Sequence, residues 1–138
     1  MNKIPNLNTQ ITNKLQIPNG EKLNKPYDLE ERTFEFAKAV AVYCKQLPKN
    51  ASNLEYGKQC IRSSASSGAN YIEANESLSK KDFLMRIKIC RKEAKESAYW
   101  LRLIVETNDE PFSREGNSLM NEAIELKKIF SSILEKSV

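Results

Sequence analysis

The sequence predicts an all-α protein: an antiparallel four-helix bundle with up-down-up-down topology. Three observations favour this fold class. Helix-forming residues dominate the 138-residue chain, no segment alternates apolar and polar residues as a strand would, and apolar residues recur every three or four positions in four segments. Short connections between these segments make consecutive helices antiparallel. The length suits one domain with a self-sufficient core.

We expect two parts in the chain, an arm at residues 1–26 and a bundle domain at residues 27–138. The arm holds six Asn and three Pro, and its apolar residues lack sustained periodicity, which is typical of a disordered or loosely docked segment. It carries four Lys and one Glu, a net charge of +3 out of +4 for the whole chain. The arm is either a solvated tail or a basic tether for RNA or a neighbouring subunit.

The first helix is predicted to begin at Asp28 as N-cap, with Glu31 in the capping-box position, and to end at Pro48. Its aromatic residues lie on more than one side, at Phe34, Phe36 and Tyr43. This distribution predicts contacts with more than one neighbour.

The second helix is predicted from Ser52, with Glu55 in the capping-box position, to about Ser77. Its middle, RSSASSGAN at residues 62–70, is poor in helix formers, but apolar and small residues keep a helical spacing at Leu54, Ile61, Ala65, Gly68 and Ile72. We expect these small residues to let another helix approach closely. A phosphate-binding loop is the alternative, but there is no GxxxxGK[ST] motif and no preceding strand.

The third helix, residues 79–106, is the longest and organises the bundle, with Ser79 and Asp82 capping its start. Its core-facing side is predicted to comprise Phe83, Ile87, Cys90, Ala94, Ala98, Leu101, Ile104 and Val105. Nearly opposite lies a set that we call the basic row, with Met85 at its edge: Lys81, Lys88, Lys92, Lys95, Tyr99 and Arg102. We predict that the basic row binds nucleic acid.

Beside both rows of this helix lies a third strip that a single bundle does not need: Ile89, Trp100 and Leu103. Exposed Trp and Leu favour association, so we predict an interface with another subunit; absorption of the strip by a twisted bundle is the alternative. Residues 108–111 end the helix. The fourth helix, about residues 113–136, is amphipathic through Leu119, Ala123, Leu126, Phe130 and Ile133.

The residue types argue against an enzyme, a metal site or a cofactor. The chain has no His, its three cysteines (Cys44, Cys60 and Cys90) sit in apolar helical patterns without a CxxC, and its Glu pairs lack the His of a di-iron Glu-x-x-His motif. We expect reduced core thiols in a cytoplasmic protein. No apolar run approaches the roughly 20 residues that span a bilayer, so no membrane association is expected.

Residues 59–104 resemble the 23S rRNA intervening-sequence protein family of bacteria. The family pattern in the second helix is matched by Gln59, Arg62, Ser63, Ser66, Ala69, Asn70, Glu73 and Ala74. The pattern in the third helix is matched by Lys80, Lys81, Asp82, Phe83, Lys92, Glu93, Ala94, Glu96, Tyr99, Trp100, Leu101, Arg102 and Leu103. Ser67-Gly68 departs from the Ile-Gly pair that is frequent in relatives. The resemblance covers about residues 27–136.

The resemblance implies four-helix bundles that assemble into homopentameric rings, and a related branch comprises RNA-binding accessory proteins of diversity-generating retroelements. In a ring, repeated basic rows would combine weak phosphate contacts. We therefore predict a non-catalytic RNA-binding oligomer. The alternative is a protein-binding scaffold, for example an accessory subunit of a reverse-transcriptase-like enzyme. The competing structural explanation is a solvated helix face, neutralised by Lys92–Glu96 and Arg102–Glu106 pairs.

Two polar residues at family-motif positions are also predicted to have a buried or interfacial role. They are Arg62 and Glu73, which flank the small-residue segment of the second helix. We expect Glu73 to pair with Arg62 or to lie across a subunit interface.

Overall fold

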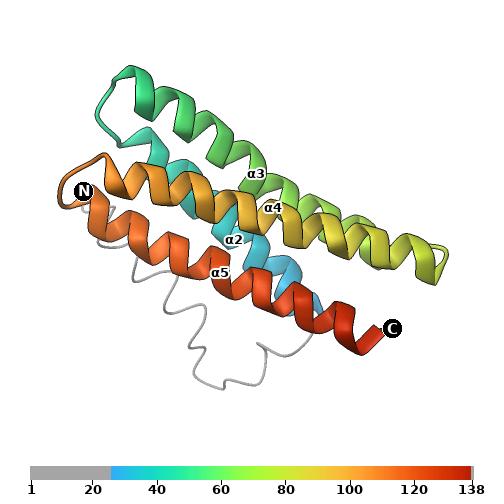
Figure 1. Cartoon of the computed structure of the whole chain (residues 1–138). Helices are drawn as coiled ribbons and strands as arrows, with labels where there is room; N and C mark the ends of the chain where they lie inside the picture. The colour runs from blue at the N-terminus through green and yellow to red at the C-terminus, as the bar shows by residue number, and fades with distance from the viewer. Residues whose placement is uncertain (1–25, 138) are drawn as a thin grey trace.

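A computed structural model describes residues 26–137, which form four helices and no strands (Figure 1). The helices are α2 (Pro26–Lys45), α3 (Ala51–Asn75), α4 (Lys80–Glu106) and α5 (Phe112–Ser137). The prediction of an all-α four-helix bundle is confirmed. The prediction for the arm lies outside the described residues, except at Pro26. None of the four helices has a stretch apolar enough and long enough to cross a membrane.

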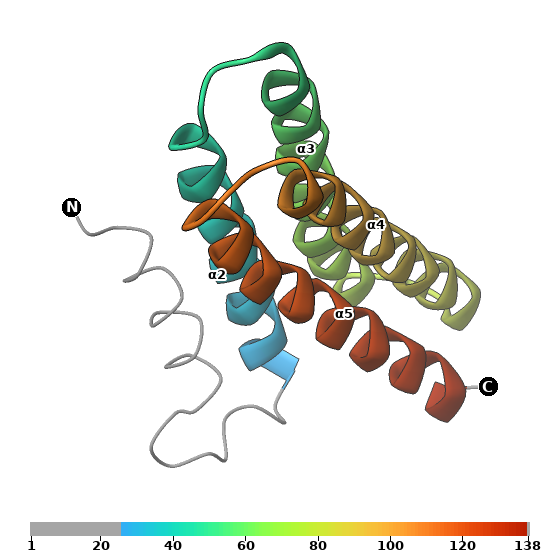
Figure 2. The ribbon, with the colours of Figure 1, turned by 60° about the vertical axis from the view of Figure 1, so that its left-hand side comes forward.

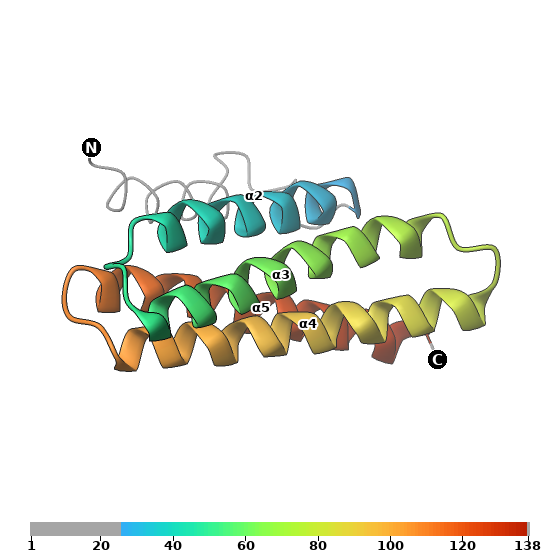
Figure 3. The same cartoon turned by 90° about the horizontal axis from the view of Figure 1, so that it is seen from above.

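The helices alternate in direction around a common core, and α2 is shorter than the other three (Figure 3). The most extensive contacts are those of α4 with α3 and α5, and the contact between α2 and α5 is much smaller. The α2–α3 and α4–α5 connections lie at the same end of the bundle (Figure 2). There the amides of Asn53 and Asn108 exchange hydrogen bonds of 3.0 and 2.9 Å, which tie the two connections together.

The narrow α2–α5 contact is held by polar groups as well as by apolar packing. Arg32 on α2 donates two hydrogen bonds, of 2.8 and 3.0 Å, to the buried carboxylate of Glu122 on α5. The hydroxyl of the fully buried Tyr43 donates to the carbonyl of Phe112 at 2.7 Å. These bonds satisfy polar groups that would be costly to bury alone.

The core largely follows the apolar periodicity of the sequence. Within the predicted inner side of α4, Ile87, Cys90, Ala94, Leu101 and Ile104 are buried, whereas Phe83, Ala98 and Val105 are half-buried at its edge. On α5, Leu119, Ala123, Leu126 and Phe130 are buried and Ile133 is half-buried.

Two of the three predicted helix starts need correction. Ser79 caps α4 as predicted, because its hydroxyl accepts the Asp82 amide N–H at 3.1 Å. The N-cap of α3 is Asn50 rather than Ser52: its side-chain oxygen accepts the Asn53 amide N–H at 2.8 Å. Helix α2 begins at Pro26, so Asp28 lies inside the first turn. Proline suits that first position because its fixed φ is helical and because the first N–H groups of a helix have no hydrogen-bond partner within the helix.

The inward face of α3 differs from the prediction. The expected inner row is exposed at Leu54 (61%), Ile61 (38%), Ala65 and Ile72 (50%), and within it only Gly68 is buried. The buried residues include Ser63, Ser64 and Ser67 instead. Each of these hydroxyls donates to a carbonyl one turn back, at 3.3, 3.2 and 2.8 Å, so burial leaves none without a partner.

Close helix packing at the small residues of α3 is confirmed. A Cβ added to Gly68 would lie 2.9 Å from the Thr33 hydroxyl oxygen on α2. The predicted close approach is therefore present, although the rotation of α3 about its axis is not the predicted one.

Candidate nucleic-acid interface

All six members of the basic row are exposed along one face of α4. These residues are not needed for packing, because the opposite side of α4 makes the core contacts. Lys81 and Arg102 are 21 positions apart, which corresponds to about 32 Å at about 1.5 Å per residue. The row therefore extends along most of the helix.

The four lysines of the row keep their charge available. Among the described side chains, no carboxylate lies within 4.0 Å of the ammonium groups of Lys81, Lys88, Lys92 or Lys95. Arg102 reaches Glu106 at 4.0 Å, and both side chains are well exposed, so this predicted pair neutralises little. The predicted Lys92–Glu96 pair is absent at that distance.

Glu96 faces α3 and is occupied there. Its carboxylate binds the Arg62 guanidinium, and the Trp100 indole N–H donates to the same oxygen, Oε2, at 3.0 Å. Partial burial by itself raises the pKa of Glu96, but the hydrogen bond from Trp100, the hydrogen bond and charge of Arg62, and the charge of Lys92 outweigh it and lower the pKa. The Glu96 carboxylate, which could otherwise pair with Lys92, is thus bound by Arg62 and Trp100 instead.

Arg62 connects two helices within the chain. Besides Glu96, it reaches Glu93 on α4 at 3.4 Å, while its own side chain remains 49% exposed. The expected Arg62–Glu73 pair is wrong. Glu73 is exposed on α3, eleven positions from Arg62, which is about 16 Å along the helix.

Three aromatic side chains extend from α3 to the basic row. Trp100 is half-buried, and its ring lies 6.1 Å from the Tyr56 ring on α3 and 5.2 Å from the Tyr99 ring, centroid to centroid. Tyr99 itself is 57% exposed. Trp100, Ile89 and Leu103 are all half-buried, so the bundle covers part of the third strip by itself.

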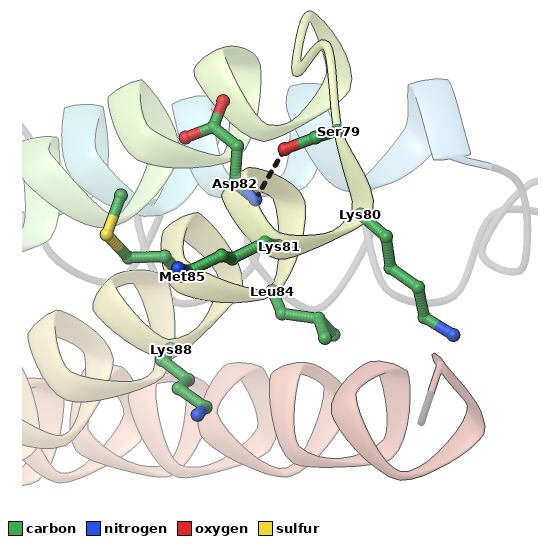
Figure 4. A pocket seen from close by; sticks show the side chains of 7 residues that line it. All are labelled: Ser79, Lys80, Lys81, Asp82, Leu84, Met85 and Lys88. Carbon is green, nitrogen blue, oxygen red and sulfur yellow. Dashed lines mark hydrogen bonds between the residues drawn. The ribbon is translucent and has the colours of Figure 1, made fainter.

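A hollow of 710 Å³ opens at the start of α4, at one end of the basic row. It is lined by Ser79, Lys80, Lys81, Asp82, Leu84, Met85 and Lys88. Figure 4 shows Lys80, Leu84 and Lys88 extending from the same side of the helix, whereas Asp82 extends from another. Three ammonium groups beside a helix N-terminus make this end of the row favourable to anions.

The cysteines provide no reactive nucleophile in the interior. Burial raises the pKa of the Cys90 thiol to about 12. A hydrogen bond with the Cys44 thiol, together with burial, raises the pKa of Cys60 well above its ordinary value. Within residues 26–137, no group of three or more Cys, Asp or Glu side chains is arranged to hold a metal ion.

Comparison with known proteins found a matching family model and a solved structure with a similar fold. Residues 25–132 match the sequence model of the 23S rRNA-intervening sequence protein. A solved protein of unknown function from the S23 ribosomal protein family of Bacteroides thetaiotaomicron VPI-5482 is 30% identical, with a TM-score of 0.70. The alignment covers 80% of this chain and 97% of that one. No protein of curated function matches the sequence.

Proposed function

Because the chain belongs to the 23S rRNA-intervening sequence protein family, and because α4 presents an exposed row of cations, we propose that it is a non-catalytic RNA-binding protein. The basic row would contact the phosphate backbone. Each lysine that neutralises a phosphate releases condensed counterions, which makes binding favourable at low salt and weaker as salt rises.

The observation that carries this proposal is that the four lysines of the row form no ion pair within 4.0 Å among the described residues. Glu93 and Glu96 lie on the same helix as the row but bind Arg62 from α3. An ordinary solvated helix face would instead be laced with pairs at i,i+4. Here the lysines stay free to exchange water and counterions for phosphates.

The test is RNA binding measured by fluorescence anisotropy over a range of salt concentrations, using the charge-reversal variant Lys88→Glu/Lys95→Glu. The matched control is Lys45→Glu/Lys49→Glu, which makes the same change in net charge at exposed positions outside α4. Losing two phosphate contacts on a single strand should reduce the slope of log K against log salt by about 1.4. Equal weakening in both variants, or no RNA binding by the wild type, would refute the proposal.

A second candidate function, assembly into a scaffold, is favoured by the outward face of α3. Leu54, Ile61 and Ile72 are exposed there, and Phe34 on the neighbouring α2 is 59% exposed. Exposed apolar residues at regular spacing mark association surfaces. We propose that this α3 face contacts the strip of Ile89, Trp100 and Leu103 on the next copy, since a ring joins two different surfaces of each subunit.

The resemblance implies five copies in this ring, and the mass in solution tests it. The variant Leu54→Ser/Ile61→Ser/Ile72→Ser should be monomeric by light scattering, with an unchanged helical circular-dichroism spectrum, because it removes only exposed side chains. A monomeric wild type would overturn self-association and leave the α3 face to a different protein. Binding to such a partner should persist at salt concentrations that abolish RNA binding.

A further inference from the structure

We infer that the basic row binds single-stranded rather than duplex RNA, and that Tyr99 is the platform on which an unpaired base stacks. This inference rests on the proposed RNA-binding function and names its substrate class. It depends on the geometry of Tyr99, on the contacts that hold Tyr99 in place, and on the cations around it.

Tyr99 has an open aromatic face. Its ring meets the Trp100 ring at 72°, an edge-to-face contact with centroids 5.2 Å apart. A perpendicular contact covers at most one face of the Tyr99 ring, and the side chain is 57% exposed. An exposed aromatic face offers a stacking surface that any base can use, because every base has a π-face.

A chain of contacts that starts on α3 fixes this platform. Arg62 binds Glu96, Glu96 accepts the Trp100 indole N–H at 3.0 Å, and Trp100 carries the edge contact to Tyr99. Tyr56 supports Trp100 from α3, with ring planes inclined by 30°. Arg62, Glu96 and Trp100 therefore act as positioning residues, since they limit the rotamers open to an otherwise solvated tyrosine. Restricting those rotamers reduces the entropy lost on binding.

Cations flank the platform on both sides along the helix. Lys92 and Lys95 precede Tyr99 by seven and four positions and Arg102 follows it by three, so all of them share its face. A strand whose phosphates contact these residues would place a base near Tyr99. In A-form duplex RNA the bases are already stacked and paired, and the deep major groove is too narrow for side chains. The open ring therefore favours unpaired nucleotides.

Trp100 is the only tryptophan of the chain, so its fluorescence reports directly on the platform. The probes are a uridine oligomer of about ten nucleotides, within the length that one binding site covers, an abasic oligomer with the same phosphates, and a blunt-ended RNA duplex. The variants are Tyr99→Ala and Tyr99→Phe. Phe34→Ala is the matched control, because Phe34 is an equally exposed aromatic residue on α2.

We expect Tyr99→Ala to weaken uridine-oligomer binding about 5- to 150-fold, the range that base–aromatic stacking supplies. Binding of the abasic oligomer and the duplex should not change. Tyr99→Phe and Phe34→Ala should retain wild-type affinity, and the uridine oligomer should alter Trp100 emission in the wild type. Arg62→Ala should weaken binding of the uridine oligomer more than binding of the other two probes, because it loosens the platform and also frees Glu96 to approach Lys92.

Two outcomes would overturn the inference in distinguishable ways. If the wild type binds all three probes equally and Tyr99→Ala changes none of them, the platform is wrong but RNA binding by charge stands. If no probe binds the wild type at low salt, the proposed function itself fails.

Discussion

Glycine-to-alanine substitutions in the helices should change stability in opposite directions, because the space around each glycine differs. A Cβ at Gly116 would lie 2.3 Å from the Tyr43 hydroxyl oxygen, 2.8 Å from a Val105 methyl and 3.0 Å from Tyr43 Cζ. Tyr43 is fully buried and its hydroxyl binds the Phe112 carbonyl, so the ring has little room to move. A Cβ at Gly57 would lie 3.5 Å from Cys44 Cβ, an ordinary van der Waals contact.

The magnitudes follow from three terms. Alanine gains about 0.8–1 kcal/mol over glycine in a helix interior. Overpacking costs about 1–3 kcal/mol, and loss of the Tyr43–Phe112 hydrogen bond costs about 0.5–1.5 kcal/mol. Gly116→Ala should therefore lower the free energy of unfolding by about 2 kcal/mol, whereas Gly57→Ala, which meets no clash, should raise it by about 0.8 kcal/mol.

Urea unfolding followed by circular dichroism measures both changes, and thermal melts should shift by about −8 °C for Gly116→Ala and about +3 °C for Gly57→Ala. Gly68→Ala should fall between them, because its Cβ meets the Thr33 side chain at 2.9 and 3.1 Å. The reasoning is refuted if Gly116→Ala is as stable as Gly57→Ala, since the same helix propensity acts in both and only the packing differs.

Three further predictions concern polar and titratable groups. The Ser63 and Ser97 hydroxyls lie 2.8 Å apart in the α3–α4 contact. Each single alanine substitution should lower the free energy of unfolding by about 1 kcal/mol. In a double-mutant cycle, the double variant should lose about 0.5–1 kcal/mol less than the sum of the two single losses. The pKa of Glu96 is lowered, so its contribution to stability is present above the ordinary glutamate pKa of about 4.3 and is lost as pH falls through the folded value. Trp100 emission should show this acid step in the wild type and lack it in Glu96→Gln. At pH 8 a disulfide reagent should label Cys44 alone in the folded protein and all three cysteines after unfolding. The hydrogen bond with Cys44 and burial suppress the Cys60 thiolate, and burial suppresses the Cys90 thiolate. Labelling of Cys90 without unfolding would contradict that expectation.

Helix existence and the rotation of α4 were predictable from the sequence because both depend on local chemistry. The apolar side chains of Ile87, Leu101 and Ile104 are buried in the core, so the cations spaced seven positions apart on the opposite side of α4 face the solvent. The Ser79 cap was equally local, since its partner is the Asp82 amide three residues on. The exposure of the basic row followed from the same periodicity.

The rotation of α3 and the partners of the carboxylates were decided by tertiary structure. Periodicity of apolar residues could not show that Ser63, Ser64 and Ser67 would be buried, because serine counts as polar. Their hydroxyls are satisfied by backbone carbonyls within the helix. Their small size also lets α2 and α4 approach α3 closely. Likewise, Glu96 stands four positions from Lys92 in the sequence, but α3 brings Arg62 to it. Local sequence determined which residues form helices; the competition between neighbouring helices for contact determined which charges and rings remain available on the surface.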